Sequence, residues 1–501
     1  MKIERILIED QMAPIGLDEK KPAFSWLLTA EEGEQNLMQS ACRIVVRTGE
    51  DTVWDSGKME TGVSTGIGYE GEALQPCTKY EVKAEVWDNH GGKAEAESSF
   101  ETGLMDSLYA AWEGAEWIGA PHATVCAENR GVFTIESEFR MEGGKGEAGI
   151  VFGANDFRLN DHTKNELGME GENYIRYAVC LEDGDARLEI YRVGYAPEDT
   201  AEKPFAVTKL VNWKEKTQEI LTPENADAFH KLTVEVDGNV AYAYVDGILV
   251  DAIEEHGFFG TKVSGRQLNP RGNNDVLPYP RLNEIGFYAG KGTTGYFKNL
   301  TVRNVRKPSA EIVRETPEGR LDGGKSIFAD QIPVENGYFK VEDSQITADP
   351  SHHSIPMLRS CISCQKEKKL ASARLYITAR GIYDCRINGQ EITEDLLRPG
   401  LTQYDHRMNY QTYDITELMK PGRNGIGVTL ASGWWSEAQT FVVKNFNYFG
   451  DKESLLAKVV MKYEDGSREV FGTNTEDWKY FGEGPYLFSS YFAGEQYDAR
   501  R

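Results

Sequence analysis

The chain has 501 residues, 40% of them hydrophobic and 27% charged, which is the balance of an ordinary globular protein and excludes a disordered or collagen-like chain. Its 80 Asp and Glu residues outnumber its 55 Lys and Arg residues, and the formal net charge of -25 repels polyanions, so we expect no nucleic-acid partner. At about 150 residues per domain, the length predicts three domains or a little more.

The N-terminal segment lacks the apolar stretch of a signal peptide. Charges at Lys2, Glu4, Arg5, Glu9 and Asp10 interrupt it, and no later segment reaches the roughly 18 apolar residues of a membrane span. We therefore expect a cytoplasmic protein with no membrane partner.

Residues 1–105 are predicted to form the first β-sandwich of the chain. In TKYEVKAEVWDNHGG, apolar and polar residues alternate from Tyr80 to Val86, which is the period of a half-buried strand. The length and strand spacing of this segment are those of a fibronectin III or immunoglobulin-like sandwich. Polar, turn-rich stretches at residues 104–116 and 305–325 then indicate seams between domains.

A polar loop follows the apolar strand GIVFGA. It contains Asn155, Asp156, Arg158, Asn160 and Asp161, and loops on rigid sandwiches commonly carry binding sites. The alternative is a structured turn, because Asn and Asp side chains hydrogen-bond to their own backbone. The oxygen ligands would suit calcium, but their spacing fits no named calcium loop, so we assign no metal.

Arg192 and Tyr195, in YRVGY, are two further candidates for contact with a ligand. The alternative is an exposed stack of the guanidinium on the phenol ring. We include both residues with Asn155, Asp156 and Arg158 in a predicted substrate-binding set.

Antiparallel hairpins are the dominant pattern along the chain. Dipeptides that favour tight hairpin turns separate pairs of alternating segments at Asp237-Gly238, Asp246-Gly247, Asn388-Gly389 and Asp465-Gly466. Helical periodicity is scarce, and its best short candidates lie near residues 224–229 and 415–419. We therefore predict an all-β fold made of tandem antiparallel β-sandwiches.

Seven cysteines, an odd number, do not indicate a disulfide framework. Cys361 and Cys364 form one C-x-x-C, and His352 and His353 lie upstream of it. A zinc site needs further ligands at suitable spacing, and a redox motif needs a thioredoxin-like context. We interpret the cysteines as buried or free thiols, and we expect no metal and no cofactor.

Trp434 and Trp435 follow a glycine in ASGWWSEAQTF and stand close to Glu437. Sugar rings stack their C–H faces on flat side chains and their hydroxyl groups need polar partners, so this group is a candidate sugar-binding site. The alternative is packing, because adjacent tryptophans on a strand point to opposite faces, one to the core and one to a domain interface.

The residues present no catalytic signature. A phosphate-binding loop, a G-x-S-x-G elbow and an H-E-x-x-H motif are all absent from the sequence. The 80 carboxylates do not identify a catalytic pair, because none has a distinguishing context. We therefore assign no catalytic residue.

Several long segments at both ends of the chain occur in a familiar order. KPAFSWLL, VWDSGKMETGVST and AEWIGAP lie in the N-terminal part, and LYITARGIYDCRINGQEI, LLRPGLTQYDHRMNYQTYDITELM and AGEQYDAR lie in the C-terminal part. Together they resemble the bacterial α-L-rhamnosidases of glycoside hydrolase family 78. The resemblance implies a galactose-binding-like sandwich, the rhamnosidase N-terminal domain, at the C-terminal end.

The resemblance also implies an inserted domain. In typical relatives a tract like AEWIGAP runs almost directly into one like IPMLRSCISC, whereas residues 121–310 separate them here. The strands of this block, ending in EIGFYAGKGTTGYFKNLTVRNV, are similar to concanavalin-like or laminin G-like jelly rolls, which often bind carbohydrate. The expected domains are residues 1–105, 121–310 and 311–501, the last joined in space by about 111–120.

Members of this family release terminal α-L-rhamnose by inversion, with a carboxylic acid and a carboxylate on an (α/α)6 barrel that follows the region resembling AGEQYDAR. No segment of the 501 residues resembles that barrel. The resemblance therefore implies the accessory N-terminal portion of an α-L-rhamnosidase, whose partners are a rhamnoside and the catalytic barrel, in cis or in trans. The alternatives are a stand-alone carbohydrate-binding protein and a structural spacer.

Sandwiches that lack their barrel expose an apolar docking surface. We therefore also expect self-association of the chain into a homo-oligomer, or poor solubility, when it is expressed alone.

Overall fold

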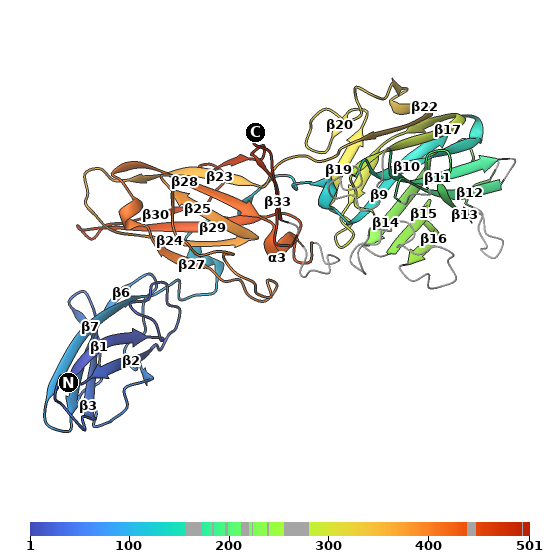
Figure 1. Cartoon of the computed structure of the whole chain (residues 1–501). Helices are drawn as coiled ribbons and strands as arrows, with labels where there is room; N and C mark the ends of the chain where they lie inside the picture. The colour runs from blue at the N-terminus through green and yellow to red at the C-terminus, as the bar shows by residue number, and fades with distance from the viewer. Residues whose placement is uncertain are drawn as a thin grey trace.

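The computed structural model describes residues 1–156, 172–182, 185–195, 199–211, 220–222, 224–237, 240–254, 280–437, 447–492 and 494–501. Strands dominate these residues and helical segments are short, so the predicted all-β fold of tandem sandwiches is confirmed. We call β1–β7 the first unit, β9–β22 the middle unit, and β8 with β23–β33 the third unit. The third unit lies between the other two (Figure 1).

The first unit is a sandwich of a three-stranded sheet, order β1-β2-β5, and a four-stranded sheet, order β4-β3-β6-β7. Its strands are β1 (Lys2–Ile8), β2 (Ala23–Thr29), β3 (Gln39–Thr48), β4 (Asp51–Asp55), β5 (Ile67–Gly68), β6 (Lys79–Asp88) and β7 (Lys93–Glu101). Tyr80, Val82, Ala84 and Val86 of β6 are buried in one core with Trp26 of β2. The predicted alternation of β6 is therefore confirmed, and it closes the space between the two sheets.

The middle unit is built on one antiparallel sheet of 14 strands, counted over the described residues. Its long path has the order β13-β12-β11-β10-β17-β9-β14-β15-β16. Its strands are β9 (Val132–Met141), β10 (Gly146–Ala154), β11 (Tyr174–Glu182), β12 (Asp185–Val193), β13 (Phe205–Leu210), β14 (His230–Asp237), β15 (Val240–Val245), β16 (Ile248–Glu254), β17 (Glu284–Phe297), β18 (Leu300–Arg303), β19 (Glu311–Thr316), β20 (Gly319–Arg320), β21 (Val334–Glu335) and β22 (Tyr338–Ala348).

The core of the middle unit continues past residue 310. The buried cluster that contains Ile150 of β10 also contains Ile312 on β19, Phe328 between β20 and β21, and Val341 on β22. The reason is pairing: β19 lies beside β18, and β22 lies beside β17 along most of its length.

The third unit is also a sandwich, with sheets of order β26-β25-β28-β23-β31 and β27-β24-β29-β30. Its strands are β8 (Ile118–Gly119), β23 (Met357–Cys364), β24 (Leu370–Arg380), β25 (Ile382–Ile387), β26 (Gln390–Glu391), β27 (Gln411–Asp414), β28 (Gly422–Ala431), β29 (Ser454–Tyr463), β30 (Arg468–Gly472), β31 (Lys479–Phe481), β32 (Tyr486–Ser490) and β33 (Gly494–Tyr497). Strand β8 precedes the middle unit in the chain, yet it pairs with β29 through Gly119 and Ser454. The third sandwich is therefore built from both sides of the middle unit.

Predicted turns and short helices are placed as follows. Asp246 and Gly247 have φ of 50° and 78°, and Asn388 and Gly389 have φ of 50° and 84°, which is the left-handed geometry that Asn-Gly and Asp-Gly hairpins favour. Among the described residues, the helical elements are η1 (Tyr109–Trp112), η2 (Ala127–Asn129), η3 (Glu142–Gly144), η5 (Thr416–Leu418) and α3 (Gly433–Ser436). In the described part of the chain, no helix has the length and apolar character to cross a membrane.

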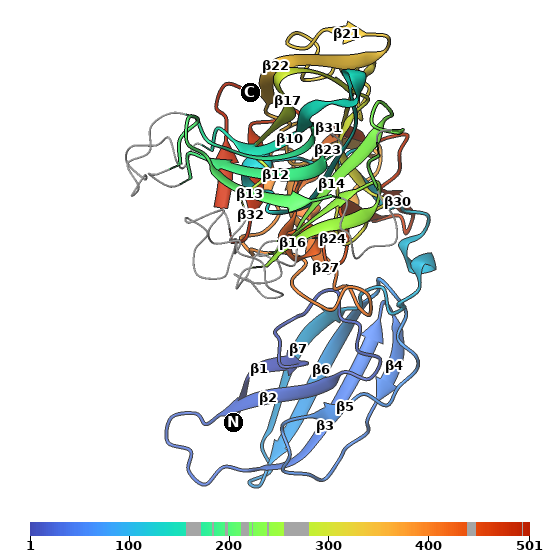
Figure 2. The ribbon, with the colours of Figure 1, turned by 90° about the vertical axis from the view of Figure 1, so that its right-hand side faces the viewer.

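The units are connected differently. A single segment after β7 joins the first unit to the third, and the first unit lies below the other two in the side view (Figure 2). Two segments join the middle unit to the third, and they pair with each other. The backbone N–H of Val125 donates to the carbonyl of His352 at 3.1 Å, and the N–H of His352 donates to that of Val125 at 3.0 Å. We call these the paired crossing segments.

Candidate functional site

Trp434 and Trp435 lie on the short helix α3, neither on a strand nor in an extended loop. The indole N–H of Trp435 donates to the carbonyl of Lys452 at 3.0 Å, and its ring packs near Tyr404, with centroids 5.8 Å apart. The ring of Trp434 lies 5.0 Å from that of Tyr491. Both indoles are half-buried, and contact of either with a sugar stays a prediction.

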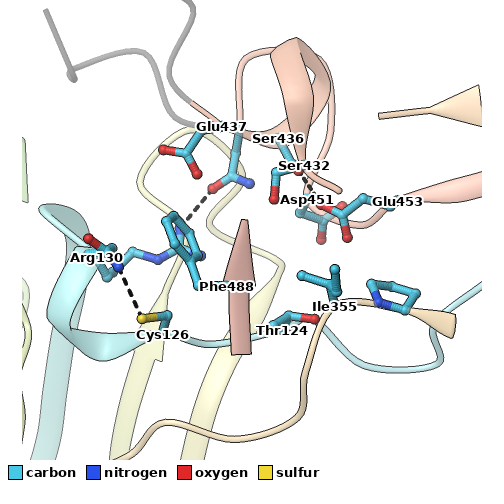
Figure 3. A pocket seen from close by; sticks show the side chains of 13 residues that line it. Thr124, Cys126, Arg130, Ile355, Ser432, Ser436, Glu437, Asp451, Glu453 and Phe488 are labelled. Atoms are coloured by element: carbon cyan, nitrogen blue, oxygen red, sulfur yellow. Dashed lines mark hydrogen bonds between the residues drawn. The ribbon is translucent and has the colours of Figure 1, made fainter. Parts of the chain in front are cut away.

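Helix α3 borders a small cavity at the junction of the middle and third units. The cavity measures about 40 Å³ and is lined by residues that include Cys126, Arg130, Ser436, Glu437, Asp451 and Glu453 (Figure 3). The first two come from the segment that enters the middle unit, and the other four come from the third unit. A space of this size accommodates water molecules and is too small for a sugar ring.

Charged side chains of opposite sign line this cavity, and its two glutamates are buried. Glu437 and Glu453 are 3% and 6% exposed, and Arg130 donates from Nη1 to Oδ1 of Asn447 at 2.9 Å. Burial raises the pKa of the Glu453 carboxyl and lowers the pKa of the Arg130 guanidinium, because each charged form has lost water. Ser436 donates its hydroxyl to Glu453. The arrangement suits a polar lock between two units.

The first two residues of the polar loop after β10 are held by hydrogen bonds. Asn155 has φ of 52°, and its side-chain amide donates to Glu284 at 2.7 Å. The backbone N–H of Asp156 donates to the side chain of Asn173 at 2.8 Å, and Asp156 is 2% exposed. Arg158, Asn160 and Asp161 lie outside the described residues. Binding of a substrate by this loop stays a prediction.

Arg192 and Tyr195 are buried at the same end of the middle unit. Arg192 is 4% exposed, forms an ion pair with Asp199 at 2.5 Å and lies 4.7 Å from the ring of Phe205. Tyr195 is 1% exposed and donates to the carbonyl of Gly153 at 2.6 Å. The alternative of an exposed Arg192–Tyr195 stack is therefore wrong: the guanidinium stacks on Phe205, and both side chains are used inside the unit.

The predicted site residues thus fall into two groups. Asn155, Asp156, Arg192 and Tyr195 lie at one end of the middle unit, whereas Trp434, Trp435 and Glu437 lie on or next to α3 of the third unit. Arg130 and Glu453 share the cavity with Glu437 and are not predicted by the sequence, because their positions are 323 residues apart and no local pattern connects them.

The two cysteines of the C-x-x-C sequence lie on the strand β23. Cys361 is exposed and Cys364 is buried, since residues three apart on β23 point to opposite faces. All seven cysteines are free. No group of three or more His, Cys, Asp and Glu side chains within the described ranges is placed to hold a metal ion.

Comparison with known families identifies two segments of the chain. Residues 368–501 match the alpha-L-rhamnosidase N-terminal domain, and residues 3–106 match the Rha78A-like N-terminal immunoglobulin domain. The resemblance to the α-L-rhamnosidases is therefore confirmed at both ends.

Individual relatives agree with these matches. An alpha-L-rhamnosidase of Streptomyces avermitilis is 26% identical over 99% of this chain, which spans 42% of that protein's length. An alpha-L-rhamnosidase of Formosa agariphila is 39% identical over 26% of this chain and 14% of its own length. The crystal structure of the Streptomyces avermitilis alpha-L-rhamnosidase complexed with L-rhamnose aligns with all of this chain and 43% of that chain, with a TM-score of 0.54 and 21% identity, so it shares the fold.

Proposed function

Since the chain has the N-terminal domains of the α-L-rhamnosidases at both of its ends, we propose that it is the accessory portion of a glycoside hydrolase that releases terminal α-L-rhamnose. Catalysis by inversion then belongs to an (α/α)6 barrel acting in cis or in trans, and the sandwiches hold that barrel and its substrate in place. The observation that carries this proposal is the pair of domain matches, one to the rhamnosidase domain itself.

An exposed aromatic surface supports a docking role. Tyr486, Tyr491, Phe492 and Tyr497, on and beside the hairpin β32–β33, are between 36% and 59% exposed. They contact each other as rings 5.0 Å apart, Tyr486 with Tyr497 and Tyr491 with Phe492. Exposed aromatic side chains in contact favour a protein surface as partner.

The proposal is tested by hydrolysis of p-nitrophenyl α-L-rhamnoside. We expect no activity from these 501 residues alone and activity when a separately expressed (α/α)6 domain of the same enzyme is added. Replacing Tyr491 and Tyr497 by Ser should weaken this complex, whereas Met38→Ser, an equally exposed change on the first unit, should not. Activity of the chain alone, or no gain over the barrel by itself, would contradict the accessory role.

We also propose that the three cores are three domains, with the boundary between the second and third near residue 349. The segment of β19 to β22 packs into the middle core, which supports this boundary over one at residue 310. In this scheme the middle unit is a concanavalin-like or laminin G-like jelly roll. Limited proteolysis that released a stable fragment ending near residue 310 would count against it.

A second function, stand-alone carbohydrate binding, is favoured by the polar turn that the middle unit presents after β10. Asn155 is exposed there, and Trp434 is half-buried on α3. Calorimetric titration of the whole chain with L-rhamnose should show binding that Asn155→Ala or Trp434→Ala abolishes without changing the unfolding temperature. Lack of binding by the parent chain would exclude this function.

A further inference from the structure

A cleft between the first and third units has the size of a small-molecule site. It measures about 470 Å³, within the range of roughly 300–1,000 Å³ that is typical of ligand pockets. One wall is the loop before β6, another is the pair β29 and β30, and the segment before η1 closes the third side. Pro76, Leu104, Ala110 and Ala111 give it an apolar surface.

Its charged side chains are mostly cationic, in contrast to the chain as a whole. Lys458, Lys462 and Arg468 line the cleft against the two carboxylates of Asp106 and Glu113. The chain carries a net charge of -25, so an excess of positive charge in this cleft is opposite in sign to the charge of the chain as a whole.

Two of the cations share one carboxylate, that of Glu113. Its Oε1 accepts hydrogen bonds from Lys458 at 2.7 Å and from Arg468 at 2.7 Å, and its Oε2 accepts a second bond from Arg468 at 2.8 Å. These bonds lower the pKa of Glu113 to about 2, so the carboxylate is charged at every working pH. Lys458 is 1% exposed and also donates to the carbonyl of Ala111 at 2.6 Å.

Lys462 differs from its two neighbours. Among the residues that the structure describes, its ammonium contacts no carboxylate, and its hydrogen bond goes to the carbonyl of Cys77 at 2.6 Å. An ammonium group has three N–H donors, and the bond to Cys77 uses one of them in a side chain that lines the cleft. A cation held in place by a neutral group, beside an apolar wall, is suited to an anionic ligand.

We propose that this cleft binds the carboxylate of a hexuronate, an acidic sugar, with Lys462 as the cation that meets it. The volume suits a sugar ring and exceeds what an inorganic anion needs, and the apolar wall suits the C–H face of the ring. The choice of a saccharide rests on the proposed function in glycan hydrolysis, whereas the choice of an anion rests on the charges alone.

The test is calorimetric titration of the whole chain with D-galacturonate at low salt. We expect binding that D-galactose does not reproduce, that weakens as salt is added, and that falls about tenfold or more in Lys462→Gln. Lys369→Gln is the matched control, because Lys369 is an exposed cation of the same unit, and this variant should bind as the parent does. Lys462→Arg keeps the charge and should bind within a few-fold of the parent.

The opposite results would overturn the proposal. They are no galacturonate binding, equal binding of galactose, or unchanged binding by Lys462→Gln. Sodium sulfate that binds as tightly as galacturonate would overturn the saccharide and leave an oxyanion site. If Lys462→Gln fails to fold, the variant Asp106→Asn tests the proposal instead. Removing that carboxylate should tighten galacturonate binding about twofold or more. An unchanged affinity would contradict the proposal.

Rhamnose binding and barrel-dependent hydrolysis, measured on the same samples, separate this inference from the proposed function. Lys462→Gln should alter neither of them. If the chain binds galacturonate but has no rhamnosidase role, the cleft is still a uronate site and the proposed function is rejected.

Discussion

The two junctions of the third unit differ in how burial and hydrogen bonds shift the pKa values of their charged side chains. Where it meets the first unit, Arg374 holds Glu101 with two hydrogen bonds of 2.7 and 2.6 Å, and Tyr410 donates to Asp18 at 2.6 Å. Against the effect of burial, the pKa of the Arg374 guanidinium is raised there by its hydrogen bonds to Glu101. Where it meets the middle unit, burial lowers the pKa of the Arg130 guanidinium and raises the pKa of the Glu453 carboxyl, so the charged forms are disfavoured.

The connections explain the difference. The first unit hangs on one segment of chain, so its position depends on directional pairs that specify one docked geometry. The middle unit is also held by the paired crossing segments, so its position depends less on such pairs. The first junction leaves an open cleft of about 470 Å³ and the second a cavity of about 40 Å³. The first junction is therefore open enough to admit a ligand, whereas the second holds the middle and third units at a fixed angle.

The largest effect is expected from breaking the first junction with Arg374→Met. The side chains of Arg374 and Glu101 are 13% and 16% exposed, so Glu101 would be left largely buried without its partner. We expect a loss of about 2–3 kcal/mol in unfolding free energy and separate melting of the first unit by calorimetry. The control Arg386→Met breaks an ion pair whose members are 51% and 54% exposed and should cost about 0.5 kcal/mol or less. Equal losses in the two variants would refute the ionic description of this junction.

A second test replaces the buried acid of the other junction by its neutral isostere, Glu453→Gln. The pKa of Glu453 is raised in the folded state, so the protonated form stabilises the fold below the ordinary value of 4.5, and that contribution is lost as pH rises through the folded pKa. The variant should therefore be more stable than the parent at about pH 8, by roughly 1 kcal/mol, and equal to it at about pH 4. Urea titrations at both pH values measure this, and a less stable variant at about pH 8 would show that the ionised carboxylate holds the junction.

His352, on one of the paired crossing segments, should give the opposite pH dependence. Burial lowers its pKa below the ordinary value of 6.5, so its contribution is present above that value and is lost as pH falls through the folded pKa. We expect the parent to lose about 1 kcal/mol or less between about pH 7 and pH 5, and His352→Gln to lose less. Unfolding temperatures against pH report it. The exposed His406→Gln should follow the parent, and a His352→Gln curve that follows it too would exclude this role.

The smallest effect is expected from salt. Raising ionic strength from about 0.05 to 0.5 M should weaken the exposed part of the first junction, near Arg468 and Glu113, by about 0.5 kcal/mol. Hydrogen exchange should then rise about twofold in residues 104–113 and stay constant in residues 125–132. A uniform rise would mean that the junctions do not differ in their electrostatics.

Sequence alone predicts the strands well and the junctions poorly. The alternation in β6 and the turn at Asn388 and Gly389 are local properties of neighbouring residues, so the amino-acid pattern is sufficient to predict them. The same pattern places Trp434 and Trp435 on a loop or a strand, because a four-residue helix is too short to produce a helical period.

The candidate site is only partly accessible to such reasoning. Glu437 can be identified from its neighbouring tryptophans, whereas Arg130 and Glu453 carry no local signal. The same is true of Glu101 and Arg374, which are 273 residues apart in the chain. Partners of this kind are chosen by the packing of whole sandwiches, which no window of sequence contains.

The paired crossing segments have a consequence for how such proteins arise. Because the chain enters and leaves the middle unit through Val125 and His352, which are bonded to each other, the gap that its deletion would leave is one that a short turn can close. The third sandwich would keep every strand, including β8. We therefore expect that joining the chain across Val125 and His352 would remove the middle unit in one step and leave the strands of the third unit in place.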